Sequence, residues 1–216
     1  MLTQDALDAL WGSGDPATAE ARLREAAAAA ESSADRAELE TQVARSLGLQ
    51  GRPDEGLALL DAVALGPSAG EERVRARVAI ERGRLVEAAG SPGDALPQFE
   101  AAATLADRAG SAFLRLEALH MIAVVAPQRA EHVTAQALEE LEAIEDPRAR
   151  RWSVALHGDL GRIRFDAGDL EGALEEFEAA LSSAQVWGTA EEAGWAREAI
   201  DECRDAIQAR NTAGEA

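Results

Sequence analysis

The sequence contains no lysine, no tyrosine and a single cysteine, Cys203. A chain without lysine cannot form the lysine-containing phosphate-binding loop, and it cannot form a Schiff base with a carbonyl substrate or a pyridoxal cofactor. One cysteine cannot close an internal disulfide or build a cysteine-based metal site. Scarce cysteine is also typical of a reducing compartment. We therefore expect a cytoplasmic protein that uses none of these cofactors.

Positive charge is scarce as well. The chain carries 21 basic residues, all arginine, against 40 acidic ones, and its net charge is −19. This charge repels phosphate backbones and anionic lipid surfaces, so we expect no binding to nucleic acid or to membranes. No stretch of 18 consecutive apolar residues provides a membrane span. The first ten residues have neither the basic start nor the apolar run of a signal peptide, and we expect none.

Aromatic residues are few, whereas alanine is abundant. Fifty alanines accompany four Phe and four Trp. Alanine is the best helix former and allows helix backbones to approach closely, so this composition favours closely packed helices. The lack of Lys and Tyr and the single Asn, Asn211, are typical of a GC-rich bacterial genome.

The sequence repeats itself with a period of 39 residues. One column of the repeat is glycine, at Gly51, Gly90 and Gly168. A second column is small, at Ala44, Gly83 and Gly161. A third column is large and apolar, at Leu60, Phe99 and Phe177. The intervening copy has Arg129 in the glycine column but keeps the apolar spacing through Thr134, Leu138 and Leu141.

Each copy predicts two helices joined by a short turn. The residues after the glycine are apolar at helical i, i+3, i+4 spacing. The glycine allows the left-handed conformation that ends the first helix, and Pro53, Pro92 and Pro147 lie near predicted helix starts, where a missing N–H costs little. We expect eleven helices and no sheet in a single domain over 1–211. Its parts are a weak repeat at 1–32, repeats at about 33–70, 71–110, 111–147 and 148–187, a capping helix at 188–211 and a disordered tail at 212–216.

These residues resemble a known repeat family. The pattern Leu160-Gly161, Gly168, Ala173, Phe177, Ala180 is similar to a tetratricopeptide repeat, and Gly83, Gly90, Ala95, Phe99, Ala102 show it again. The resemblance covers about residues 1–186. The family period is about 34 residues rather than 39, and its aromatic before the Leu-Gly pair is replaced by Ala79 and His157. The resemblance implies an all-α, right-handed superhelix (α-solenoid) of about five antiparallel helix pairs with a C-terminal capping helix.

The resemblance also implies that the first helix of each pair lines a concave groove. The position after the small column holds Arg45, Arg84, Ala123 and Arg162. Arg77 lies two turns before Arg84, Leu119 and Ala123 interrupt the arginines, and Phe165 follows Arg162 by one turn. We expect these seven residues to bind a peptide or protein segment, because arginine grips carboxylates in a bidentate manner. The alternative is that each arginine pairs with a Glu or Asp of a neighbouring helix and stabilises the stack.

Other motifs give no evidence of catalysis. The segment Gly12-Ser13-Gly14 matches the start of a dinucleotide-binding fingerprint, but it follows a helical segment rather than a strand. The three histidines, His120, His132 and His157, fall on different predicted helices without the i, i+4 spacing of a metal pair. No nucleophile is accompanied by a recognisable base. We expect no enzyme, no cofactor and no metal site.

The function that the sequence favours is a scaffold for protein–protein interaction, whose partner is a peptide or protein segment with acidic groups. Two alternatives stay open. One is a self-assembling repeat module, in which the partner is a second copy of the chain, because a repeat array without a good polar cap tends to associate. The other is a small-molecule sensor or helical enzyme with its site in the groove.

Overall fold

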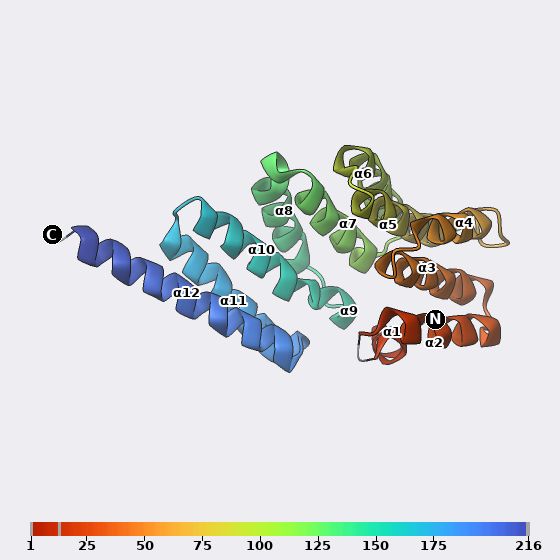
Figure 1. Cartoon of the computed structure of the whole chain (residues 1–216), viewed down its shortest axis with the longest axis horizontal. Helices are drawn as coiled ribbons and strands as arrows, with labels where there is room; N and C mark the ends of the chain where they lie inside the picture. Colours follow the sequence, from red (N-terminus) through yellow and green to blue (C-terminus); the bar gives the residue numbers. More distant parts are fainter. Residues whose placement is uncertain (1, 13, 215–216) are drawn as a thin grey trace. The chain divides into compact units, whose positions relative to one another are not determined.

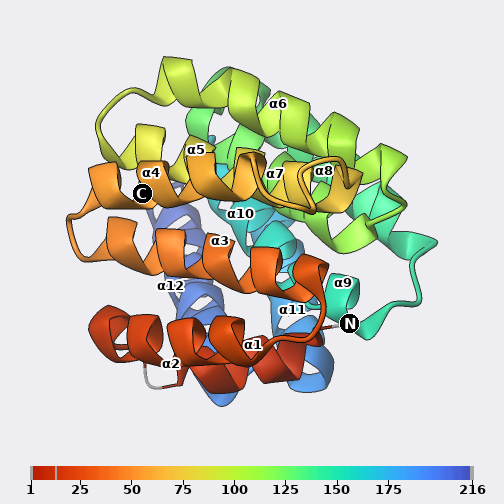
Figure 2. The same cartoon turned by 90° about the vertical axis from the view of Figure 1, so that its right-hand side faces the viewer.

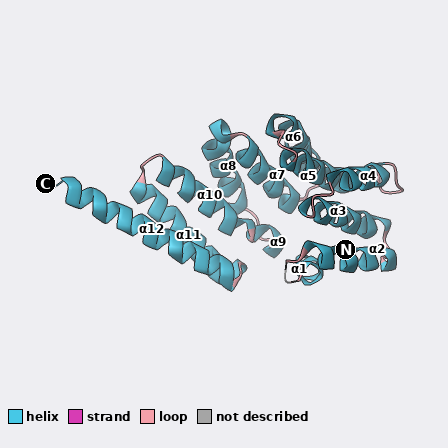
Figure 3. Cartoon of the chain, in the orientation of Figure 1, coloured by secondary structure: helices cyan, strands magenta, loops and turns pink. Residues whose placement is uncertain are grey.

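The computed structural model describes residues 2–12 and 14–214. Every regular element in these residues is a helix and none is a strand, which confirms the all-α prediction (Figure 3). None of these helices is both long enough and apolar enough to cross a bilayer. The helices, labelled in Figure 1, are α1 (Gln4–Trp11), α2 (Pro16–Ala29), α3 (Ser33–Leu49), α4 (Pro53–Ala64), α5 (Glu72–Ala88), α6 (Pro92–Arg108), α7 (Ala112–Val125), the short 3-10 helix η1 (Pro127–Arg129), α8 (Ala130–Glu142), α9 (Pro147–Arg150), α10 (Trp152–Asp166), α11 (Leu170–Trp187) and α12 (Ala190–Gly214).

The helices group into two compact units, Met1–Ala126 and Pro127–Ala216. The first unit holds α1 to α7 and the second holds η1 to α12. The boundary falls inside the expected repeat at 111–147, in the copy where Arg129 replaces the glycine. There the chain turns through η1, which starts at Pro127, instead of through a left-handed glycine.

In the first unit each helix packs on the next one along the chain from α1 to α7. In addition, α3 packs on α5 and α5 packs on α7. The helices α3, α5 and α7 therefore lie side by side as one layer of this unit (Figure 2). These are the helices that open the second, third and fourth expected repeats.

In the second unit α11 packs between α10 and α12, and α8 packs on α10. The expected capping helix is α12, which continues past residue 211 to Gly214, so only 215–216 of the expected tail fall outside the described residues. The described residues form twelve α-helices and the 3-10 helix η1, so the expectation of eleven helices is wrong. The hydroxyl of Ser153 donates to the carbonyl of Arg150 (2.7 Å), and the Val154 N–H turns to the Arg151 carbonyl instead. This exchange interrupts the helical ladder and separates α9 from α10.

The turn chemistry follows the sequence pattern. Gly51, Gly90 and Gly168 have φ angles of +73°, +86° and +84°, which confirms the left-handed turn predicted for the glycine column. Each of these turns leads into the second helix of its pair. The segment from Gly12 to Gly14 joins α1 to α2, so a helix precedes this glycine pair, and Ser13 lies outside the described residues.

The small and large columns of the repeat pack against each other. A Cβ built on Gly83 would lie 2.5 Å from Cε1 of Phe99, and one on Gly161 would lie 2.6 Å from Cε1 of Phe177. Both phenylalanines are completely buried. Glycine is thus required because the ring occupies the place of a methyl group, as expected of a densely packed core. In the preceding copy the same two positions hold Ala44, which is larger than glycine, and Leu60, which is smaller than phenylalanine.

We predict that Phe99→Ala and Phe177→Ala each lower the free energy of unfolding by about 3–5 kcal/mol, because each leaves a cavity in a closed core. Chemical denaturation followed by circular dichroism measures this loss. A loss below about 1 kcal/mol in both variants would show that this column does not belong to the core.

We further predict that Gly83→Ala destabilises the protein through the contact with Phe99, and that adding Phe99→Leu recovers part of the loss. The double variant copies the Ala44–Leu60 pair of the preceding repeat and removes the ring atoms that the new methyl group meets. Gly194→Ala is the matched control, because a Cβ on Gly194 meets no atom within 4 Å. A double variant no more stable than the Gly83→Ala variant would contradict this packing.

Candidate functional site

A cluster of charged side chains crosses the layer of α3, α5 and α7 in the first unit. On α5 the residues Arg73, Arg77, Glu81 and Arg84 recur at three- and four-residue intervals, which places them along one face of the helix. α3 supplies Glu38, Gln42 and Arg45, and α7 supplies Glu117. We call this set of eight residues the charged cluster.

Glu117 is the centre of the charged cluster. Its Oε2 accepts a hydrogen bond from Arg77 (2.7 Å), and its Oε1 accepts one from Arg84 (2.9 Å). Arg77 also donates to Oε1 of Glu38 (3.2 Å), and only 4% of its side chain is exposed. Arg77 therefore ties all three helices together in a buried position.

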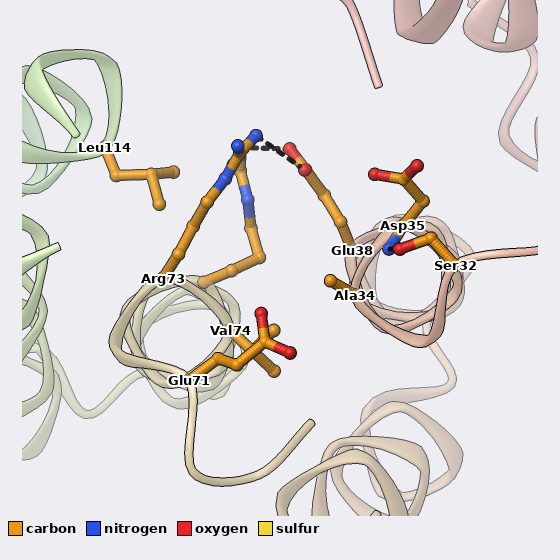
Figure 4. A pocket seen from close by; sticks show the side chains of 9 residues that line it. Ser32, Ala34, Asp35, Glu38, Glu71, Arg73, Val74 and Leu114 are labelled. Carbon is orange, nitrogen blue, oxygen red and sulfur yellow. Dashed lines mark hydrogen bonds and ion pairs between the residues drawn. The ribbon is translucent and has the colours of Figure 1, made fainter. Parts of the chain in front are cut away.

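The rest of the charged cluster completes these contacts. Arg84 donates to Oε1 of Glu81 (3.0 Å), and the Gln42 amide donates to the same oxygen (3.2 Å). Arg73 donates to Oε2 of Glu38 (2.8 Å), and Figure 4 shows its guanidinium directed at that carboxylate. Glu38 and Arg77 stand 39 residues apart, as do Gln42 and Glu81. The repeat thus places equivalent positions of neighbouring helix pairs side by side.

The pairing controls the charge of Glu117. Burial by itself would raise the pKa of the Glu117 carboxyl, but Arg77 and Arg84 outweigh burial and lower this pKa to about 2. Burial would likewise lower the pKa of the Arg84 guanidinium, but Glu81 and Glu117 raise it above its usual value. Both side chains are therefore fully charged near neutral pH. Removing one member of such a buried pair leaves an uncompensated charge.

Two pockets open on this surface and share Arg77 in their walls. The first, the Glu38 pocket, has a volume of about 260 Å³ and is walled by Glu38, Glu71, Arg73 and Leu114 (Figure 4). The second, the Arg45 pocket, has a volume of about 320 Å³. Its walls include Leu7 and Trp11 of α1, Arg45 and Leu49 of α3, and Phe113 of α7.

The structure brings Arg45, Arg77 and Arg84 together in the first unit. Arg45 and Arg84 share the repeat phase, and Arg77 lies two turns before Arg84. Arg77 and Arg84 both pair with Glu117 of the neighbouring helix α7. This is the arrangement expected if the arginines stabilise the helix stack instead of binding a partner. Arg45 instead lies over the ring of Trp11, 5.4 Å from its centroid. Leu119 and Ala123, expected in the groove wall, are buried in α7 and line neither pocket.

Arg162 and Phe165 belong to the second unit. The Arg162 guanidinium donates to Oε2 of Glu202 on α12 (2.9 Å). It also lies 5.1 Å from the ring centroid of Phe165 and 5.6 Å from that of Phe177. This arginine therefore joins α10 to α12, as expected if the arginines pair with acidic residues of neighbouring helices.

The sequence prediction missed the acidic and aromatic members of the site. Glu38, Glu81 and Glu117 provide its carboxylates, and Trp11 and Phe113 its aromatic walls. One signal was available, because the 39-residue alignment sets Glu38 against Arg77, an acid against a base in one column. Within the described residues no three His, Cys, Asp or Glu side chains are grouped to hold a metal ion.

We predict that Glu117→Gln lowers the free energy of unfolding by roughly 3–5 kcal/mol at pH 7, because Arg77 and Arg84 both lose a buried counterion. The folded-state pKa of Glu117 is depressed, so its contribution is full above pH 4.5, the ordinary value, and is lost as the pH falls towards 2. The stability difference between the native protein and the variant should shrink over this range. Denaturation series at several pH values measure it.

Glu202→Gln is the control for this experiment, because it breaks the exposed ion pair with Arg162. Such pairs contribute roughly 0–1 kcal/mol. A Glu117→Gln variant as stable as the Glu202→Gln variant at pH 7 would contradict the stabilising role of the charged cluster.

The comparisons with known proteins bear on the fold. No family model and no curated protein matches the chain. Among solved structures it is similar to the crystal structure of BtubC (BKLC) from P. vanneervenii, with a TM-score of 0.62 and 16% sequence identity over 97% of this chain and 92% of that chain. At this identity the likeness concerns the fold alone, and the fold they share is helical.

Proposed function

We propose that the protein is a scaffold for protein–protein interaction and that the α3, α5 and α7 surface binds a segment of a partner protein. We also propose that the helices form a superhelical solenoid, that the chain belongs to a tetratricopeptide-like family, and that it acts in the cytoplasm of a bacterium, as the sequence favours. The observation that carries it is the pair of pockets, of about 260 and 320 Å³, that meet at Arg77 on one surface. A chain segment, which has successive side chains, can use both pockets at once.

The rigidity of the surface supports binding. Arg77 and Arg84 are each held by two carboxylates from different positions of the layer. Side chains fixed in this way lose little rotamer freedom when a partner arrives, and less of the binding free energy is spent on ordering them. The surface is thus preorganised by contacts that the partner does not have to make.

The same contacts argue against catalysis at this surface. A general acid or base works best with a pKa near the working pH. The pKa of Glu117 is lowered to about 2, and that of Arg84 is raised above an already high value. The carboxylates of the charged cluster serve their arginine partners, so we propose a binding protein that is not an enzyme and needs no cofactor.

A second candidate function, self-association, is favoured by exposed apolar side chains. In the second unit Val186 is 68% exposed and Trp195 is 44% exposed. Large side chains of this kind mark interaction sites when they lie together. The molar mass from light scattering over a range of concentrations tests this candidate, and a mass equal to that of one chain throughout would eliminate it.

The scaffold proposal is tested with two exposed leucines of the first unit. Leu49 is 62% exposed and lines the Arg45 pocket, whereas Leu65 is 88% exposed and lines neither pocket. We predict that Leu49→Ser weakens capture of the partner from the native cytoplasm by tenfold or more, about 1.4 kcal/mol, and that Leu65→Ser does not. Quantitative mass spectrometry of the captured proteins measures both. Equal capture by the two variants and the native protein would contradict a binding role for this surface.

A further inference from the structure

Arg45 differs from the other arginines of the charged cluster. Arg73, Arg77 and Arg84 each donate to at least one carboxylate. Within the described part of the chain Arg45 makes no hydrogen bond and no ion pair, and its guanidinium contacts the ring face of Trp11. It is half-buried, so solvent only partly replaces a counterion.

The charged cluster holds more guanidinium groups than carboxylates. Four guanidinium groups, those of Arg45, Arg73, Arg77 and Arg84, share three carboxylates, those of Glu38, Glu81 and Glu117. Arg84 lowers the pKa of the Arg45 guanidinium, burial lowers it further, and Glu81 and Glu117 only partly compensate. An arginine whose pKa is lowered by a neighbouring cation lacks a counterion of its own. Within the charged cluster, Arg45 is thus the arginine that has no carboxylate bound to it.

The pocket around Arg45 has both apolar and polar walls. Leu7, Trp11, Leu49 and Phe113 form its apolar wall. The Asp8, Arg77 and Glu117 side chains also line it, and Arg77 and Glu117 are paired with each other. The Gln42 side chain is occupied, because its oxygen accepts from the Trp11 indole (3.3 Å) and its nitrogen donates to Glu81. Arg45 is left as the strong donor that a bound group can use.

We propose that the Arg45 pocket binds a carboxylate that is carried next to an apolar group, with the carboxylate on Arg45 and the apolar group against Trp11 and Phe113. The guanidinium stacks through its face and donates hydrogen bonds through its edge, so the Trp11 contact and a bidentate carboxylate are compatible. The volume of about 320 Å³ suits one apolar acid of side-chain size. This inference rests on the proposed binding surface and names the chemical group that the surface selects.

The same chemical group has two sources: an acidic residue beside an apolar one in a partner segment, and a free organic acid. Three probes separate the possibilities. They are 3-phenylpropionate, its uncharged amide, and the blocked dipeptide N-acetyl-aspartyl-phenylalanine amide. Titrations followed by the NMR signal of the Trp11 indole N–H give the dissociation constants. We expect 3-phenylpropionate to bind at least tenfold more tightly than its amide, and binding to weaken as salt is added.

Variants assign the binding to Arg45. Arg45→Gln should weaken the acid probes at least tenfold. Arg162→Gln is the matched control, because Arg162 holds the same repeat position and also stacks on an aromatic ring but is paired with Glu202. It should leave the dissociation constants unchanged. The melting temperature gives an independent check: it should stay the same in Arg45→Gln, which breaks no ion pair, and fall by several degrees in Arg77→Gln.

The outcomes are distinct. Equal binding of 3-phenylpropionate and its amide, or unchanged acid binding in Arg45→Gln, would overturn the inference. Tighter binding of the dipeptide than of 3-phenylpropionate supports the site with a peptide as its source, and the reverse order supports it with a free acid. If the acid probes bind through Arg45 while Leu49→Ser captures as much partner as the native protein, the carboxylate site stands and the scaffold function fails.

Discussion

The carboxylate of Glu117, held between the guanidinium groups of Arg77 and Arg84, is the interaction on which the first unit depends. It connects α7 to α5, and Arg77 extends the connection to Glu38 on α3. Buried charges are costly unless they are paired with good geometry. The three helices can therefore pack in this layer only in the register that satisfies all of these contacts. The same register fixes the positions of the two pockets, which share Arg77 in their walls.

The repeat period explains how one sequence provides both the charged contacts between repeats and the apolar contacts within each repeat. Side chains 39 residues apart lie next to each other on neighbouring helix pairs, so Glu38 meets Arg77. The pairing between the two helices of one repeat works differently, through shape. Gly83 leaves room for the ring of Phe99, and Gly161 for that of Phe177. Charge complementarity thus adds to the apolar contacts between successive repeats, while size complementarity closes each one.

Features with a local cause could be predicted from the sequence, and features that depend on helix rotation could not. The left-handed glycines at 51, 90 and 168 follow from the turn alone, and the helix pairs follow from their apolar spacing. The arginine positions could also be found. Of their partners, Glu38 could be found because it lies one period before Arg77. Glu117 could not, because it reaches Arg77 and Arg84 across offsets of 40 and 33 residues, outside the repeat period. The buried state of Leu119 and the break between α9 and α10 likewise depend on contacts that the pattern does not contain.

A double-mutant cycle between Arg77 and Glu117 tests most directly whether paired buried charges hold the layer together. The free energy of unfolding is measured for the native protein, Arg77→Gln, Glu117→Gln and the double variant, with the Arg45 and Glu117 pair as the control cycle. The account predicts a coupling of at least about 1 kcal/mol between Arg77 and Glu117, since the second change removes a charge that the first left unpaired. It predicts a much smaller coupling in the control cycle. Additivity within about 0.5 kcal/mol for Arg77 and Glu117 would contradict it.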